Sequence, residues 1–222
     1  DLGSPRAWLL VLGLGGLGAG AALQRHCAVE LCHTPRQQPA PPLPLVLLQG
    51  NIPQDEKFQP GSGVPMALQW YGDRLTSLGD ALVVAPETAV PLLPQQLPGG
   101  YLETIAQHFA RGDQAALLGM PLGSFDTGYT NSVVGFQAGQ AEPYRYDKHH
   151  LVPFGEFIPP LFRWFTELMQ IPLGDFSRGA LAQPPFVWRG ERIAPNICYE
   201  DLFGEELAAN FRDPAAAPTV FV

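Results

Sequence analysis

Charged residues are scarce in this sequence, and positive charge is nowhere concentrated. Of the 222 residues, 15% are charged, and the formal net charge is −8, whereas roughly a quarter is usual for soluble globular proteins. Proteins that bind nucleic acid need clustered lysine and arginine side chains to neutralise phosphates. Because the chain has no basic stripe, we expect no nucleic-acid partner.

Cysteine is also scarce, and the three cysteines cannot all pair within one chain. Cys27 and Cys32 are close enough in sequence to form a disulfide in an oxidising compartment. Cys198 is then left over, as a catalytic thiol would be. His26 and His33 flank the first two cysteines, but this spacing matches no standard zinc pattern. We therefore expect no metal site, and we also expect no cofactor.

A long apolar run lies near the start of the chain. Residues 7–23 carry no charge for 17 positions, and Arg6 and Arg25 bracket them. A membrane helix needs about 17–25 such residues, so residues 1–25 are interpreted as the remnant of a transmembrane helix. A secretory signal and a buried soluble helix remain as alternatives.

The chain changes character after this run. Residues 26–44 are rich in proline and glutamine and are interpreted as an extended linker. In the remainder, 45–222, apolar runs are separated by glycine and proline, which is typical of a folded domain with long loops. The last residues, 218–222, are interpreted as a strand interrupted midway, so we expect the domain to be incomplete at this end.

Strand-like and helix-like segments alternate along 45–222, which predicts an α/β fold. Two segments have helical spacing, 66–78 and 101–112. In the first, four apolar residues can share one face: Met66, Trp70, Leu75 and Leu78. Short apolar segments predict strands within 43–52, within 80–90 with its end at Pro86, at 115–123, and as a further pair within 130–137 and 141–156 that leads to a loop. Residues 191–211 are interpreted as a strand, an elbow and then a helix.

Three of the predicted strands stop at a functional group, namely Glu87, Lys148 and Cys198. In open α/β sheets, sites form just beyond the carboxyl ends of strands, so these groups are expected to meet. A thiol with a pKa of about 8.5 needs a base at neutral pH, and Glu87 is the candidate. Lys148 would stabilise the negative charge that acyl transfer creates. The alternatives are a packing cysteine, a capping glutamate and a solvated lysine.

The segments around these residues, "VVAPET", "YDKHHLVPFGE" and "ICYED", resemble the nitrilase (carbon–nitrogen hydrolase) superfamily. Within it, "LLQGNIPQDEKF" and "KHHLVPFGEFIP" are similar to the bacterial apolipoprotein N-acyltransferases. The resemblance runs from about Leu45 to Val222. It implies a nitrilase-like α-β-β-α sandwich, truncated here at its C-terminal end, and a Glu-Lys-Cys triad.

The resemblance implies roles for six residues. Glu87 would be the general base, Lys148 the charge stabiliser and Cys198 the nucleophile that accepts the acyl group. Glu156 would be a supporting acid, with a loop ion pair to Lys148 or Arg145 as the alternative. The two residues that follow the thiol would shape the pocket, Tyr199 and Glu200.

The resemblance also implies the reaction, in which a fatty acyl chain passes from a phospholipid to the N-terminal amine of a diacylglyceryl-cysteine lipoprotein. Transfer would proceed through a thioester in two half-reactions, at the bacterial cytoplasmic (inner) membrane on its periplasmic side. The aromatic segment 154–176 is interpreted either as an arm or lid that meets lipid or as a core helix. The rival functions are a soluble nitrilase-type amidase and a non-catalytic envelope binding domain.

Overall fold

The computed structural model describes residues 42–157 and 176–222. The chain divides into two compact units, Asp1–Pro42 and Leu43–Val222, and the elements described below belong to the second unit. The predicted membrane helix, the Cys27–Cys32 pair, nearly all of the linker and most of the aromatic segment lie outside the described residues. Within the described ranges, no helix is long and apolar enough to span a bilayer.

A five-stranded mixed sheet forms the centre of the second unit. Its strand order is β1-β2-β3-β4-β5, with β1, β2 and β3 parallel and β4 antiparallel to both of its neighbours. β1, β2, β3 and β5 therefore point the same way, and their carboxyl ends lie at one edge of the sheet. The strands are β1 (Leu45–Leu47), β2 (Leu82–Val84), β3 (Ala115–Ser124), β4 (Gly128–Gln137) and β5 (Tyr144–Asp147).

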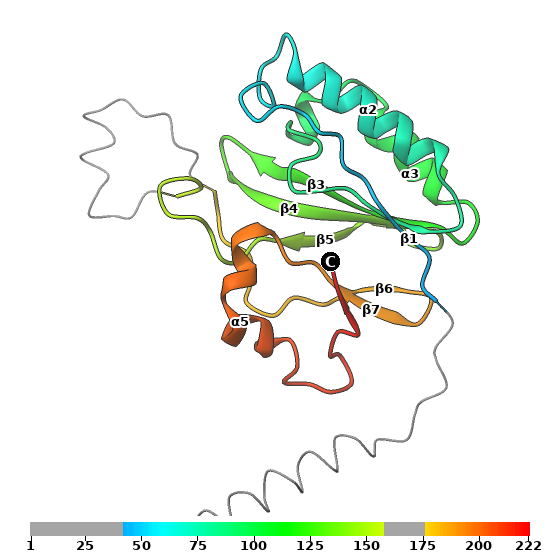
Figure 1. Ribbon diagram of the computed structural model, residues 1–222, viewed down its shortest axis with the longest axis vertical. Helices are drawn as coiled ribbons and strands as arrows, with labels where there is room; N and C mark the ends of the chain where they lie inside the picture. Colours follow the sequence, from blue (N-terminus) through cyan, green and yellow to red (C-terminus); the bar gives the residue numbers. More distant parts are fainter. Residues whose placement is uncertain (1–41, 158–175) are drawn as a thin grey trace, which may run out of the picture. The chain divides into compact units, whose positions relative to one another are not determined.

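Two helices, α2 (Gly63–Ser77) and α3 (Tyr101–Phe109), cover one face of this sheet (Figure 1). A single turn of 3₁₀ helix, η1 (Pro94–Gln96), precedes α3. The helix predicted at 66–78 is confirmed, but Met66 is 47% exposed and does not face the core. The buried stripe of α2 runs instead through residues spaced four apart, namely Ala67, Tyr71 and Leu75.

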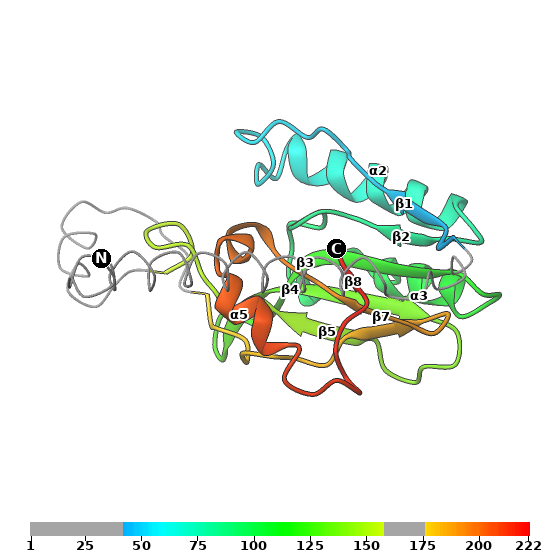
Figure 2. The same cartoon turned by 60° about the horizontal axis from the view of Figure 1, so that its bottom comes forward.

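A second sheet of three strands covers the opposite face of the first. It contains β6 (Phe186–Trp188), β7 (Glu191–Ala194) and β8 (Val220–Phe221). Its apolar side chains pack with those of β2 and β3 in one buried cluster, which contains Leu82, Ala115, Leu117, Phe186, Trp188 and Ile193. Figure 2 shows this helix–sheet–sheet layering from a second side. The α/β sandwich expected from the sequence is therefore confirmed.

The strand β6 was not predicted, although its connection to β7 carries a recognisable turn signal. Arg189 and Gly190 have φ angles of 48° and 81°, and this pair of positive values is typical of a two-residue hairpin turn. The helix predicted after Cys198 is present but broken. It begins as the 3₁₀ helix η3 (Cys198–Leu202) and continues as the short α5 (Gly204–Ala209).

Candidate active site

Glu87 stands on a tight turn just after β2, as the sequence predicts. Thr88 adopts a φ of 48°, a conformation that residues other than glycine rarely take. The turn lies directly on β3, and Val90 donates its N–H to the carbonyl of Gly119 at 3.1 Å. A Cβ atom at Gly119 would come within 2.2 Å of the Pro86 carbonyl oxygen and 2.8 Å of the Glu87 Cα. Glycine at position 119 is therefore required for this packing.

Lys148 follows β5 directly, and its side chain is 1% exposed. Its Nζ donates to Oε1 of Glu87 at 3.1 Å and lies 2.9 Å from Oε2 of Glu156. Burial alone would lower the pKa of Lys148, but the hydrogen bond to Glu156 and the charges of both carboxylates raise it overall. Lys148 is therefore held as a cation. The ion pair considered for Glu156 is formed with Lys148, whereas Arg145 pairs with Asp147.

Asn131, on β4, binds the carboxylates of both Glu87 and Glu156. It was not predicted from the sequence as a site residue. It is 2% exposed, and its Nδ2 donates to Oε1 of Glu87 at 2.6 Å and to Oε1 of Glu156 at 2.7 Å. A signal was available, because three consecutive polar residues precede the apolar part of this strand. All three are buried, namely Thr130, Asn131 and Ser132.

Cys198 is an exposed free thiol at the first position of η3, with a φ of 52°. It lines a cavity of about 120 Å³ together with Glu87, and Val84, Leu117 and Ile197 contribute apolar walls. Partial burial and then the charge of Glu87 raise the pKa of Cys198, while the charge of Lys148 opposes them. The thiol is therefore mainly protonated at neutral pH and needs a base before it can react.

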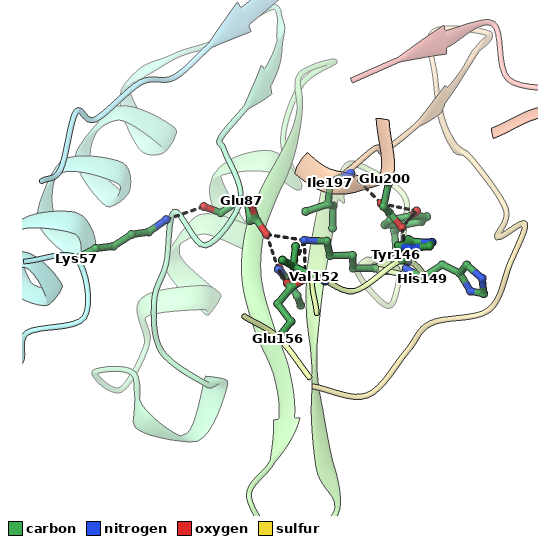
Figure 3. Close-up of polar contacts among 11 residues, drawn as sticks. Lys57, Glu87, Tyr146, His149, Val152, Glu156, Ile197 and Glu200 are labelled. Carbon is green, nitrogen blue, oxygen red and sulfur yellow. Dashed lines mark hydrogen bonds and ion pairs between the residues drawn. The ribbon is translucent and has the colours of Figure 1, made fainter. Parts of the chain in front are cut away.

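Glu200 is buried and lies behind the thiol. Its carboxylate accepts hydrogen bonds from the Tyr146 hydroxyl at 2.9 Å, from the His149 N–H at 2.7 Å and from the Ile197 N–H at 2.8 Å (Figure 3). Glu200 does not line the cavity beside Cys198, whose described walls come from other residues. It therefore links the loop of Lys148 to the turn of Cys198, and its part in shaping the pocket stays a prediction.

Tyr199 also lies away from the described walls of this cavity. Its ring stands edge-on to Phe203, with centroids 5.3 Å apart, and is tilted against His150 at 5.6 Å. His150 in turn stacks on Phe203 and contacts the carboxylate of Glu206 at 3.0 Å. These contacts place Tyr199 in a small aromatic cluster that packs the residues after the thiol against the loop of Lys148.

Three chemical functions thus lie near one another. Glu87 supplies a carboxylate and Cys198 a thiol to one cavity, and Lys148 places its buried ammonium 3.1 Å from that carboxylate. A carboxylate can accept the thiol proton, and a fixed cation can stabilise an oxyanion. The arrangement is suited to covalent catalysis at a carbonyl carbon.

Known proteins resemble this chain in sequence. The family model described as carbon–nitrogen hydrolase matches residues 66–217. A protein of Verminephrobacter eiseniae called apolipoprotein N-acyltransferase is 64% identical over 97% of this chain, which spans 40% of that protein. A protein of the same name from Ralstonia nicotianae is 47% identical over 81% of this chain and 34% of its own length.

Among solved structures, the carbon–nitrogen hydrolase of Helicobacter pylori shares 16% identity, with a TM-score of 0.47, over 76% of this chain and 56% of that chain. The chain spans well under half the length of the two N-acyltransferase relatives. The family model, however, covers more than half of the chain. The chain therefore belongs to the carbon–nitrogen hydrolase family.

Proposed function

We propose that this chain carries the catalytic part of an N-acyltransferase. The enzyme moves a fatty acyl chain from a phospholipid to the N-terminal amine of a diacylglyceryl-cysteine lipoprotein, and so matures lipoproteins. The observation that carries the proposal is that Glu87 and Cys198 line one cavity and that Glu87 also binds the buried ammonium of Lys148. Relatives named apolipoprotein N-acyltransferase, at 64% and 47% identity, supply the substrate class.

The first half-reaction loads the thiol. Glu87 takes the proton of Cys198, and the sulfur attacks the carbonyl carbon of a phospholipid acyl ester. Lys148 lies beside Glu87 and offsets the negative charge that develops on the carbonyl oxygen. The ester C–O bond then breaks, and the lysophospholipid leaves as an alcohol after taking back the proton from Glu87. The product on the protein is a thioester at Cys198.

The second half-reaction transfers the acyl group. The uncharged N-terminal amine of the lipoprotein attacks the thioester carbon, the C–S bond breaks, and an amide forms. One amine proton passes through Glu87 to the departing sulfur, which restores both side chains. Water competes with the amine for the thioester, so the apolar cavity walls support transfer over hydrolysis.

The substrates place the protein at a membrane. We propose that residues 1–25 form a membrane helix, that 26–44 link it to the catalytic domain at 45–222, and that this domain faces the periplasm. The uncharged run at 7–23 supports this placement. A lipid donor and a lipid-bearing acceptor would then reach the site from the membrane surface.

Purified full-length protein in detergent, given phospholipid and a diacylglyceryl-cysteine peptide, tests the proposal by mass spectrometry of the peptide. The peptide should gain one fatty acyl group at its N-terminal amine, and the Cys198→Ser variant should give none. A matched peptide with an acetylated N-terminus controls for transfer to other groups. Hydrolysis of small amides without any peptide acylation would contradict the proposal and indicate an amidase. A thiol that is inert under all conditions would indicate a non-catalytic binding domain.

A further inference from the structure

The chain has two lysines, and both contact Glu87. Lys148 binds the carboxylate, as described above. Lys57 donates from its Nζ to the backbone carbonyl oxygen of Glu87 at 3.0 Å. In Figure 3 the side chain of Lys57 extends to Glu87 from the side opposite to Glu200. The second contact has no place in the two half-reactions, and it needs its own explanation.

A compact loop before α2 delivers Lys57 to this position. Within the loop, Glu56 and Lys57 both donate their N–H groups to the carbonyl of Pro53, at 3.1 and 2.9 Å. The loop packs closely on the first residue of α2, because a Cβ atom at Gly63 would lie 2.1 Å from the Glu56 carbonyl oxygen and 2.9 Å from the Lys57 nitrogen. The base of the Lys57 side chain is therefore fixed by backbone contacts.

The target of Lys57 is the part of the Glu87 turn that needs support. The peptide after Glu87 leads into Thr88, whose φ of 48° is unfavourable for a residue with a side chain. Such a conformation persists only where surrounding contacts hold it. Gly119 allows the turn to lie on β3, and Lys57 holds the turn by a second contact, at the carbonyl of Glu87.

The environment of the ammonium agrees with a fixed, partly desolvated contact. Burial lowers the pKa of Lys57, and the charge of Glu87 opposes that effect. A hydrogen bond from a charged donor is stronger than one between neutral groups. Lys57 can therefore hold the Glu87 backbone more firmly than a neutral side chain would.

We propose that Lys57 is a positioning residue for Glu87. By fixing the peptide after Glu87, its ammonium keeps the carboxylate at the cavity that Cys198 also lines. The inference rests on the proposed role of Glu87 as the base. In this inference Lys57 contacts neither substrate. The alternative is that the charge of Lys57 binds the phosphate of the donor lipid.

The test compares Lys57→Met, which keeps the stem and removes the ammonium, with Lys57→Arg, which keeps a charged donor. Arg74→Met is the matched control, because it removes an exposed cation from the last turn of α2. In full-length protein, Lys57→Met should lower kcat roughly tenfold and leave KM for phospholipid unchanged. Lys57→Arg should recover part of the loss, and Arg74→Met should match the unmodified protein.

A second readout does not depend on acyl transfer. The charge of Glu87 raises the pKa of Cys198, so this pKa depends on where the carboxylate lies. If Lys57→Met lets the carboxylate move, the pH midpoint of Cys198 alkylation should fall toward that of Glu87→Gln. This measurement tests Lys57 even if the unmodified protein transfers no acyl group, an outcome that would contradict only the proposed function.

Three results would overturn the inference. The first is an unchanged kcat together with an unchanged alkylation midpoint in Lys57→Met. The second is a higher KM at constant kcat, which would assign the ammonium to the donor phosphate. The third is a Lys57→Arg variant as impaired as Lys57→Met. Circular dichroism of each variant checks its fold, and where Lys57→Met fails to fold, Lys57→Gln replaces it in the same measurements.

Discussion

The carboxylate of Glu200 accepts a hydrogen bond of 2.7 Å from the main-chain N–H of His149, 51 residues earlier in the chain. His149 follows Lys148, and Glu200 lies two residues after Cys198. The same carboxylate accepts the N–H of Ile197 at 2.8 Å. One buried side chain therefore sets the distance between the loop that carries the ammonium and the turn that carries the thiol.

Replacement of Glu200 by glutamine tests this link. Every hydrogen-bond partner of the Glu200 carboxylate is a donor. An amide in its place would turn an N–H group toward at least one of these donors, and that hydrogen bond would be lost. We expect Glu200→Gln to lower the free energy of unfolding by about 2 kcal/mol and to slow acylation of Cys198. Chemical denaturation measures the first effect. Glu205→Gln on the exposed side of α5 is the control and should change neither quantity.

A smaller change at the same site is Tyr146→Phe, which removes one donor to Glu200 and keeps the ring. It should cost about 1 kcal/mol of unfolding free energy. If both Glu200→Gln and Tyr146→Phe were as stable and as active as the unmodified protein, the two loops would be held by other contacts, and the role assigned to Glu200 would be wrong.

The reactivity of Cys198 should depend on pH in a direction that the structure fixes. Partial burial and the charge of Glu87 raise the pKa of the thiol, so the thiol stays protonated to a higher pH than a free cysteine does. Alkylation by iodoacetamide, which needs the thiolate, should therefore have its midpoint above the ordinary thiol value. Peptide mass spectrometry as a function of pH measures this midpoint for Cys198 alone.

Glu87→Gln should then separate thiolate formation from catalysis. Removing the negative charge lowers the pKa of Cys198, so the alkylation midpoint should fall. Acyl transfer from phospholipid should nevertheless be lost, because the amide cannot accept the thiol proton. An alkylation midpoint that rises in Glu87→Gln, or acyl transfer that persists, would contradict the assignment of Glu87 as the base.

Gly119 allows the Glu87 turn to lie on β3, and Gly119→Ala tests how tightly that contact fixes the site. The added methyl group would meet the Pro86 carbonyl oxygen at 2.2 Å, and the turn would have to move. We expect a loss of about 2 kcal/mol in unfolding free energy and at least a tenfold loss of kcat, since small misplacements of catalytic groups are costly.

The control for this variant is Gly99→Ala. A Cβ atom at Gly99 would meet no atom within 4 Å, so its stability and kcat should match those of the unmodified protein. A fully active Gly119→Ala protein would show that the position of the turn does not determine catalysis.

The sequence predicts the part of the site that lies at strand ends. Glu87 and Lys148 each follow a short strand of the first sheet, and the rule that sites form at the carboxyl ends of strands is enough to expect these two together, whereas Cys198 follows β7 of the second sheet. The rule holds for Glu87 and Lys148 because β2 and β5 run in the same direction and both end at the same edge of the sheet. The contact between Glu87 and Lys148, 61 residues apart, is the result.

The sequence does not predict the contacts that depend on how layers pack. Asn131 and Lys57 reach Glu87 from β4 and from the loop before α2. The polar run of β4 marks Asn131 as unusual, but neither segment indicates that Glu87 is the partner. The core face of α2 is also hard to predict from the sequence. Met66 is apolar, yet it is exposed, because the packing of the helix on the sheet decides which of its apolar residues are buried.

The central claim is that Cys198 carries the acyl group. Full-length protein incubated with phospholipid and no acceptor, then digested and analysed by mass spectrometry, tests it most directly. We predict one fatty acyl group in thioester linkage on Cys198, absent in Glu87→Gln and discharged when a diacylglyceryl-cysteine peptide is added. An unmodified Cys198 under conditions in which the peptide is still acylated, or an acyl group on another residue, would contradict the account.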